Sequence, residues 1–441
     1  MWTLGWPPFG SLVFEWEYFF LGVKRGVIHG VDLGGLSERV GKARLKLAGF
    51  ALSRGWYRLA LVVFPLHQEQ LQVSPAWVRL ASTFARKARL EGAESIADAV
   101  SHQLALSLRG PNRVAELFEA AFGLGASEAT KIRSRGLTGG QANAYCFVHS
   151  VEIGGQYHGI VEKALGRAGT NELRFAKLVL TDRVDTSGCN VPRFFAADHT
   201  RGMALLFQEY VAKDLEQKAT YPLEIALKIA RKIGRFSALN PVQNGEDLGL
   251  RINPRMHVLR VPSERALISV FPKIPESEIF DIKDKMDRVA REMPVWDDAV
   301  AKLPHALAHN DISTGNVIVH DGEPFFIDWG WAAPVPLGAD LYGLIHITPG
   351  AVSDEYVRGA LMQAYRNGLE SGGQRGYPCD RDLEMALWWG FARRYVPLLR
   401  EDYWECLVLA VEKSVDIIGR LKADEGVAVS PGPSGRGGLL S

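Results

Sequence analysis

"HNDISTGNVIVHDGEPFFIDW", residues 309–329, places a tight-turn signal between two short apolar runs. Val317–Val319 and Phe325–Ile327 consist of β-branched and aromatic residues, which favour strands. Asp321-Gly322 between the runs is a residue pair typical of a two-residue hairpin turn. The stretch therefore predicts a β-hairpin.

The length of the turn also predicts which residues face each other across the hairpin. With a two-residue turn, Val317 faces Phe326 and Gly315 faces Asp328. Asn316 and Asp328 then lie together at the open end of the hairpin. A carboxylate and an amide oxygen that converge there form a site of the kind that Mg²⁺ binds when it also bridges substrate phosphates.

Asp311 precedes Asn316 in the loop that enters the hairpin. From this position a carboxylate can orient an attacking hydroxyl and accept its proton. The alternative is an Asx-rich loop that caps an ordinary hairpin, since Asp and Asn are common turn residues. Three such groups at the mouth of one hairpin favour a catalytic site.

The spacing of these side chains resembles the motifs of the aminoglycoside phosphotransferase and choline kinase family, small-molecule kinases related to the protein kinases. The resemblance rests on His309-x-Asp311-x4-Asn316, on Ile327-Asp328-Trp329 and on "PLGADL", which contains Asp340. It implies that Asp311 and His309 are catalytic residues, with Asp311 as the base. It also implies that Asn316 and Asp328 bind Mg²⁺, with Asp340 as a supporting carboxylate.

The subfamily stays open. His309-Asn310-Asp311 is closer to choline and ethanolamine kinases, whereas "IDWGWA" (327–332) is more similar to the aminoglycoside enzymes. The resemblance therefore implies a small-molecule hydroxyl acceptor that is a sugar, an amino sugar or an amino alcohol.

"LTGGQANAYCFVHSVEIGGQYHGIVEKAL" (137–165) predicts two strands joined at Gly154-Gly155 and preceded by a glycine-rich loop. That loop resembles the nucleotide-binding loop of the family, with Gly139, Gly140 and Asn143 at matching positions and Ala142 where serine is common. Small residues let main-chain N–H groups approach phosphates closely. The loop is therefore expected to bind the phosphates of ATP, although an ordinary turn is the alternative.

Lys163 ends the second of these strands, where a lysine can reach the α and β phosphates. A lysine on a strand is commonly just solvated, but a predicted helix, "NELRFAKLV" (171–179), follows and supplies Glu172 as an ion-pair partner. Further on, "MALLFQEYV" (203–211) predicts a buried strand that ends in a polar hinge. Glu209 and Val211 resemble the linker whose main chain binds adenine.

Composition limits the possible classes of protein. The chain has 441 residues, 47% of them hydrophobic, and a net charge of +1, which provides no general attraction to nucleic acid. Four scattered cysteines predict neither a zinc site nor a disulfide framework and suit a reducing cytoplasm. The aromatic segment 1–38 carries Glu15 and Glu17 and lacks a basic start, so it predicts neither a signal peptide nor a transmembrane segment.

Residues 39–125 predict a helical domain in which a short sequence pattern recurs. Leu47-Ala48 aligns with Leu80-Ala81 at a spacing of 33 residues, close to that of stacked helix pairs. The segment resembles degenerate tetratricopeptide repeats, which use residues such as Trp77, Leu80, Phe84 and Ala93 for packing. A plain helical bundle is the alternative. The basic polar face of these helices is either solvated or a surface for a protein partner.

"DLEMALWWGFARRYVPLL" (382–399) predicts an amphipathic helix. Its aromatic residues belong either to the core or to the wall of an acceptor pocket, where they would hold a quaternary ammonium by cation–π attraction: Trp388, Trp389, Phe391 and Tyr395. Asp297-Asp298 and Asp354-Glu355 could recognise an amino sugar or be simply exposed. The tail 426–441 is rich in Gly, Pro and Ser and is predicted to be disordered.

Taken with the resemblance, these features predict an α+β, two-lobe, protein-kinase-like fold preceded by an all-α domain. The expected lobes are a β-rich N-lobe at 126–210 and a helical C-lobe at 211–425. The expected activity is transfer of the γ-phosphoryl group of ATP, with Mg²⁺, to a hydroxyl. Two alternatives are a pseudokinase that acts through its N-terminal helices and a protein kinase, although no Asp-Phe-Gly to Ala-Pro-Glu segment follows Asp328.

Overall fold

A computed structural model of the chain describes residues 112–125, 131–137, 143–165, 170–200, 203–212, 220–243, 248–250, 261–373, 378–393 and 403–428, together with Ser101, Leu104, Ala105 and Leu108. The chain divides into two compact units, Met1–Gly110 and Pro111–Ser441. The aromatic segment 1–38, the tetratricopeptide-like helices proposed before residue 101, and the loop with Gly139 and Gly140 lie outside the described residues. The second unit contains a sheet lobe and a helical lobe.

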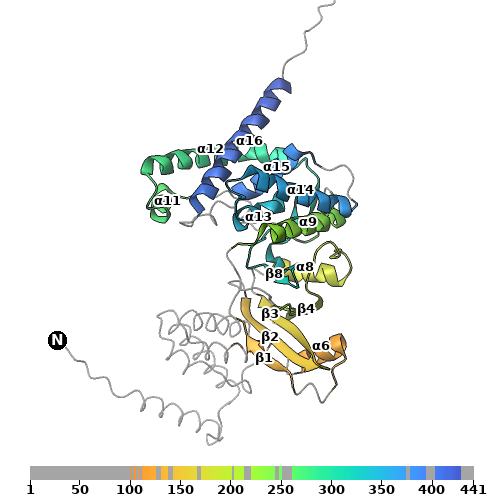
Figure 1. Ribbon diagram of the computed structural model, residues 1–441. Helices are drawn as coiled ribbons and strands as arrows, with labels where there is room; N and C mark the ends of the chain where they lie inside the picture. Colours follow the sequence, from red (N-terminus) through yellow and green to blue (C-terminus); the bar gives the residue numbers. More distant parts are fainter. Residues whose placement is uncertain are drawn as a thin grey trace, which may run out of the picture. The chain divides into compact units, whose positions relative to one another are not determined.

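The sheet lobe is built on a five-stranded antiparallel sheet in the order β1-β2-β3-β5-β4. Its strands are β1 (Arg133–Gly136), β2 (Asn143–Ile153), β3 (Gln156–Leu165), β4 (Phe194–Thr200) and β5 (Met203–Glu209). Gly154 and Gly155 join β2 to β3 with φ values of 58° and 79°, which glycine adopts without strain. The predicted strand–turn–strand unit is confirmed, and Figure 1 shows β1, β2 and β3 side by side.

The period of two along a strand decides on which face Lys163 lies. Lys163 pairs with Cys146 across β2 and β3. It lies on the same face of the sheet as a small apolar cluster of Cys146, Val148 and Val161. The next residue, Glu162, lies on the opposite face, where its carboxylate accepts a hydrogen bond from the Tyr145 hydroxyl at 2.8 Å. The alternation therefore separates Lys163 from the buried polar network of the other face.

Helix α6 (Arg113–Phe122) belongs to the same unit as the sheet. The Phe122 ring lies 4.7 Å from the His158 ring and 5.5 Å from the Phe195 ring, measured between centroids. Arg113 forms an ion pair with Asp198 of β4 at 3.2 Å. The two compact units divide at residue 110, before this helix, and the domain boundary expected at residue 125 stays a prediction.

The helical lobe contains α9 (Leu223–Leu239), α11 (Glu264–Val270), α12 (Glu276–Val300), α13 (Tyr342–Ile347), α14 (Glu355–Ser371), α15 (Asp380–Ala392) and α16 (Trp404–Ala428). Helices α9 and α14 lie side by side (Figure 1). They pack closely because glycines lie where they meet. A Cβ atom at Gly234 would lie 2.1 Å from the Tyr365 carbonyl oxygen, and one at Gly368 would lie 2.1 Å from that of Arg231. Only residues without a side chain permit this approach.

Short strands carry the central loops of this lobe. They are β6 (Pro241–Val242), β7 (His305–Ala308), β8 (Val317–His320), β9 (Glu323–Phe326) and β10 (Ala333–Pro336). Strands β8 and β9 form the predicted hairpin in the predicted register, with Val317 paired to Phe326. Asp321 and Gly322 have φ values of 49° and 69°, as a two-residue turn of this type requires.

The structure describes the helix that carries the predicted aromatic residues and the helix that precedes the tail. Trp388, Trp389 and Phe391 are buried in α15, which ends at Ala392, and Tyr395 lies outside the described residues. Helix α16 continues to Ala428, past the predicted start of the tail at residue 426. Of the helices in the described part of the chain, none combines the length and apolar character needed to cross a membrane.

Candidate active site

The loop between β7 and β8 is organised around His309. The Nδ1 atom of His309 accepts a hydrogen bond from the Asp311 main-chain N–H at 3.2 Å. The proton of the neutral ring is therefore assigned to Nε2, which donates to the Ile327 carbonyl oxygen at 2.9 Å. Since both ring nitrogens are engaged and the side chain is buried, His309 supports the loop.

Asp340 holds the start of the same loop from a short 3-10 helix, η4 (Ala339–Leu341). Its carboxylate accepts hydrogen bonds from the main-chain N–H groups of His309 and Asn310, at 3.0 and 2.8 Å. Asn310 has a left-handed φ of 60°, and its carbonyl oxygen accepts a hydrogen bond from the Tyr342 hydroxyl at 2.6 Å. The expected supporting carboxylate is thus in direct contact with the backbone of this loop.

Asp311 and Asn316 lie in contact within this loop. The Nδ2 atom of Asn316 donates to the Asp311 carboxylate at 2.8 Å and to the Asp311 carbonyl oxygen at 2.9 Å. The Asn316 carbonyl oxygen accepts a hydrogen bond from the Ile327 N–H at 2.9 Å. This bond continues the hairpin beyond Val317–Phe326 and places Asp328 directly after the pairing partner of Asn316.

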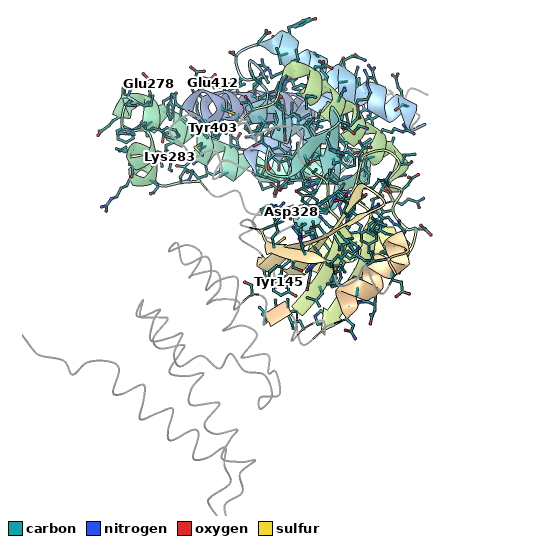
Figure 2. All side chains as sticks on the ribbon, turned by 60° about the horizontal axis from the view of Figure 1, so that its bottom comes forward. Tyr145, Glu278, Lys283, Asp328, Tyr403 and Glu412 are labelled. Carbon is teal, nitrogen blue, oxygen red and sulfur yellow. The ribbon has the colours of Figure 1, made fainter. Side chains whose placement is uncertain are left out.

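Asp328 is held in an unusual main-chain conformation. Its φ and ψ are 61° and 65°, a left-handed conformation that costs a residue other than glycine some strain. A Cβ atom at Gly330 would lie 3.2 Å from the Asp328 Oδ1 atom, so glycine leaves space around the carboxylate. Figure 2 shows Asp328 beside the ribbons of the sheet lobe, consistent with the electrostatic interaction of its carboxylate with Lys163.

Lys163 and Glu172 form a buried ion pair between β3 and helix α8 (Thr170–Leu180). The Nζ atom of Lys163 lies 2.7 Å from Glu172 Oε1, and the two side chains are 8% and 3% exposed. Burial disfavours the charge on Lys163, but the carboxylates of Glu172 and Asp328 outweigh this effect and raise the pKa of the amine. Lys163 is therefore a fixed positive charge beside Asp328.

The hinge after β5 is partly engaged in the sheet. The Glu209 N–H donates to the Arg193 carbonyl oxygen at 2.8 Å, and the Glu209 carboxylate accepts from the Arg193 N–H at 3.2 Å. The Tyr210 N–H donates to the Gly159 carbonyl oxygen at 2.9 Å. Within the described part of the chain, the N–H of the buried Val211 donates to no protein acceptor.

The charged pairs suggested for an amino sugar have structural roles. Trp389 Nε1 donates to Asp297 Oδ1 at 2.8 Å, and the guanidinium of Arg393 pairs with the same carboxylate oxygen. The Asp354 carboxylate caps α14 by accepting from the Tyr356 N–H at 2.8 Å.

Sequence reasoning missed the contacts that join α8 to the segment after Asp328. The Phe175 and Trp329 rings are stacked at 4.0 Å with an interplanar angle of 3°. The buried Asn171 amide donates to the Ala332 carbonyl oxygen at 3.2 Å. The spacing of four between Asn171 and Phe175 places both on one face of α8, a signal that could indicate a docking face but not its partner.

The donor set suits a hard cation that is also bound by phosphate. Among the residues that the structure describes, no three His, Cys, Asp or Glu side chains are grouped so as to hold a metal ion. The candidate site offers the Asp328 carboxylate and the Asn316 amide oxygen, which fits Mg²⁺ when phosphate oxygens and water complete its coordination. The residues present therefore fit this metal.

Residues 167–377 match the phosphotransferase enzyme family. The matched region includes Glu172, the loop between β7 and β8 and the hairpin, whereas Lys163 lies just before it. The protein is therefore an enzyme, a phosphotransferase with an alcohol group as acceptor. No curated protein matches the chain.

Several solved structures are similar to part of the chain at low identity. A spectinomycin phosphotransferase in complex with ADP and spectinomycin is 13% identical, with coverage of 70% of this chain and 98% of that chain and a TM-score of 0.37. A choline kinase from Streptococcus pneumoniae is 12% identical, with coverage of 70% and 98% and a TM-score of 0.40. A Plasmodium vivax ethanolamine kinase is 11% identical, with coverage of 81% and 96% and a TM-score of 0.41. These values are too low to transfer the role of any residue.

Proposed function

We propose that the protein is a small-molecule kinase that uses ATP and Mg²⁺ to phosphorylate a hydroxyl of a sugar, an amino sugar or an amino alcohol. The observation that carries the proposal is the contact between Asp311 and Asn316 at the hairpin mouth, where Asp328 follows the partner strand. A base and two oxygen ligands are thereby gathered at one place. Such a group serves phosphoryl transfer, which depends mainly on positioning and charge neutralisation.

Asp311 is the proposed base. Its carboxylate accepts the proton of the acceptor hydroxyl as the oxygen attacks the γ-phosphorus, and the bond from the γ-phosphorus to the β–γ bridging oxygen breaks, so that ADP leaves. The Asn316 amide holds one oxygen of the Asp311 carboxylate at 2.8 Å. Because the Nδ2 atom of Asn316 is directed to Asp311, its Oδ1 atom is the group left for the metal. His309 and Asp340 hold the loop backbone and touch no reacting atom in this scheme.

Asn316 and Asp328 are the proposed Mg²⁺ ligands. When bound, Mg²⁺ would neutralise charge on the phosphates and so reduce their repulsion of the incoming oxygen. The strained backbone of Asp328 directs its carboxylate to a site that Gly330 leaves open.

Lys163 is the proposed ligand of the α and β phosphates, with Glu172 fixing its amine. The glycine-rich loop with Gly139, Gly140 and Asn143 is proposed to cover the phosphates. The Val211 N–H is proposed to bind adenine, and the hinge at Glu209 to link an N-lobe and a C-lobe. All four cysteines are free thiols, which supports a cytoplasmic location.

The test is a turnover screen of the purified full-length protein with ATP or GTP and Mg²⁺ against a panel of sugars, aminoglycosides and amino alcohols. Formation of a phosphorylated acceptor that requires Mg²⁺ and is lost in Asp311→Asn is the expected result. Nucleotide binding without turnover on any acceptor would instead favour a pseudokinase that acts through its N-terminal region.

A further inference from the structure

Helix α8 is joined to the turn after Asp328 by two buried contacts. The Phe175 ring stacks on the Trp329 ring at 4.0 Å, and the two side chains are 0% and 2% exposed. The Asn171 amide donates to the Ala332 carbonyl oxygen at 3.2 Å, just beyond the 3-10 helix η3 (Trp329–Trp331). Both partners on α8 lie on one helix face.

The same helix carries one member of the charged pair at the candidate site. Glu172, next to Asn171 in sequence, faces Lys163 at 2.7 Å, while Trp329 directly follows Asp328. A shift of α8 away from η3 would therefore separate Glu172 from Lys163. A shift of η3 would move Asp328 with it.

Trp329 is fixed from its other side by the helical lobe. Its Nε1 atom donates to the Phe326 carbonyl oxygen at 3.1 Å. Its ring lies 4.6 Å from that of His309 and 5.1 Å from that of Phe236 in α9, measured between centroids. Of the rings that contact Trp329 in the described part of the chain, Phe175 is the one that belongs to α8.

We propose that Asn171 and Phe175 are positioning residues that hold α8 against η3, so that Lys163 and Asp328 can bind the same metal–nucleotide complex. This inference rests on the proposed function, because it concerns how two groups of the proposed site are kept at a fixed separation. Asp328 interacts electrostatically with both Lys163 and Glu172, so a change in their separation alters the charge that a bound phosphate meets. The contacts act through other residues and do not touch the ligand.

The expected signature is a loss of metal-dependent nucleotide affinity. In Phe175→Leu and in Asn171→Leu, which keeps the volume and removes the donor, the gain in ATP affinity produced by Mg²⁺ should fall about 10-fold or more, the usual effect of groups that orient metal ligands. ATP affinity in EDTA should change much less. Calorimetric titration of the full-length variants with ATP, with Mg²⁺ and with EDTA, measures both quantities.

Phe236→Leu is the matched control. It shortens another buried ring against Trp329, but from α9, so it should lower the melting temperature without the selective loss of the Mg²⁺ effect. Trp329→Phe keeps a ring against Phe175 and should retain more of the Mg²⁺ effect than Trp329→Leu. Variants of Asn171 and Phe175 that behave like Phe236→Leu would overturn the inference. A wild-type protein whose ATP affinity does not depend on Mg²⁺ would overturn the proposed function instead.

Discussion

Asn316 donates hydrogen bonds from one amide nitrogen to both the carbonyl oxygen and the carboxylate of Asp311, at 2.9 and 2.8 Å. The two residues are therefore one structural unit. The amide fixes the orientation of the carboxylate, and the carboxylate fixes which end of the amide remains for a ligand. A substitution at either residue should disturb the other.

Asp311→Asn should lower turnover about 10²- to 10⁴-fold, the range for removal of a positioned general base, while nucleotide affinity stays near the wild-type value. Steady-state kinetics with an identified acceptor and a nucleotide titration measure the two quantities. Asp321→Asn is the matched control, because Asp321 is an exposed turn residue with positive φ that asparagine tolerates. Wild-type turnover in Asp311→Asn would contradict its role as the base.

Asp328→Ala should abolish Mg²⁺-dependent activity, and Asn316→Ala should raise the Mg²⁺ concentration needed for half-maximal turnover. The carboxylate is the charged ligand of the pair, so its loss should be the more severe. A Mg²⁺ titration of turnover for each variant is the measurement. Unchanged metal dependence in both would show that these two residues do not share a metal ion.

Lys163→Met should destabilise the protein by about 3–5 kcal/mol, because it leaves Glu172 buried without its cationic partner. Burial raises the pKa of Glu172 above its ordinary value of 4.5 and Lys163 lowers it, so removal of the Lys163 amine should raise this pKa further. A carboxyl with a raised folded-state pKa stabilises the fold below its unfolded-state pKa and loses that contribution as pH rises.

As pH rises above about 4.5, the melting temperature of Lys163→Met should therefore fall relative to that of the wild type. The double variant Lys163→Met/Glu172→Gln removes the titrating group and should lose this pH dependence. A fall of the same size in the double variant would assign the effect to other residues.

Asp340→Asn should destabilise the catalytic loop, because an amide of the same shape presents an NH₂ group to one of two main-chain N–H donors. Loss of one such buried acceptor costs about 1–3 kcal/mol. We expect a lower melting temperature together with a reduced kcat and a nearly unchanged KM for ATP. Thermal unfolding and steady-state kinetics measure the two effects, and a variant with lower stability but wild-type kcat would limit Asp340 to a role in folding.

A fragment that begins at residue 111 should be more stable than one that begins at residue 126. The longer fragment keeps α6, whose Phe122 packs against His158 and Phe195 and whose Arg113 pairs with Asp198. Melting curves of the two fragments, with and without ATP and Mg²⁺, compare them directly. Equal melting temperatures would show that α6 is dispensable and would favour the boundary at residue 125.

The hairpin and its register could be predicted from the sequence because a two-residue turn determines pairing by local geometry alone. Asp321-Gly322 sets the pairing of Val317 with Phe326, and the pattern of the chain between residues 137 and 165 likewise predicts β2, β3 and the glycine turn between them. The pairing of Lys163 with Glu172 also follows from nearby elements, since only nine positions separate them.

The role of His309 depended on tertiary contacts. Its motif position indicates a place in the catalytic loop, but a motif does not distinguish a side chain that touches substrate from one that supports the backbone. The hydrogen bonds of both ring nitrogens and the burial of the side chain assign the supporting role. Asp297 is a similar case, because its contact with Trp389 joins residues 92 positions apart.

The sequence by itself determined the hairpin, the strand that carries Lys163 and the residue types of the site, because each follows from turn geometry, strand period and short spacings. Only the tertiary structure decided that α6 belongs with the sheet and that Asn171 and Phe175 dock on the turn after Asp328. The Asn171–Ala332 hydrogen bond joins residues 161 positions apart. Such a contact forms when two segments that are distant in sequence pack together. The local sequence of each segment indicates a buried face, but it does not indicate which other segment covers that face.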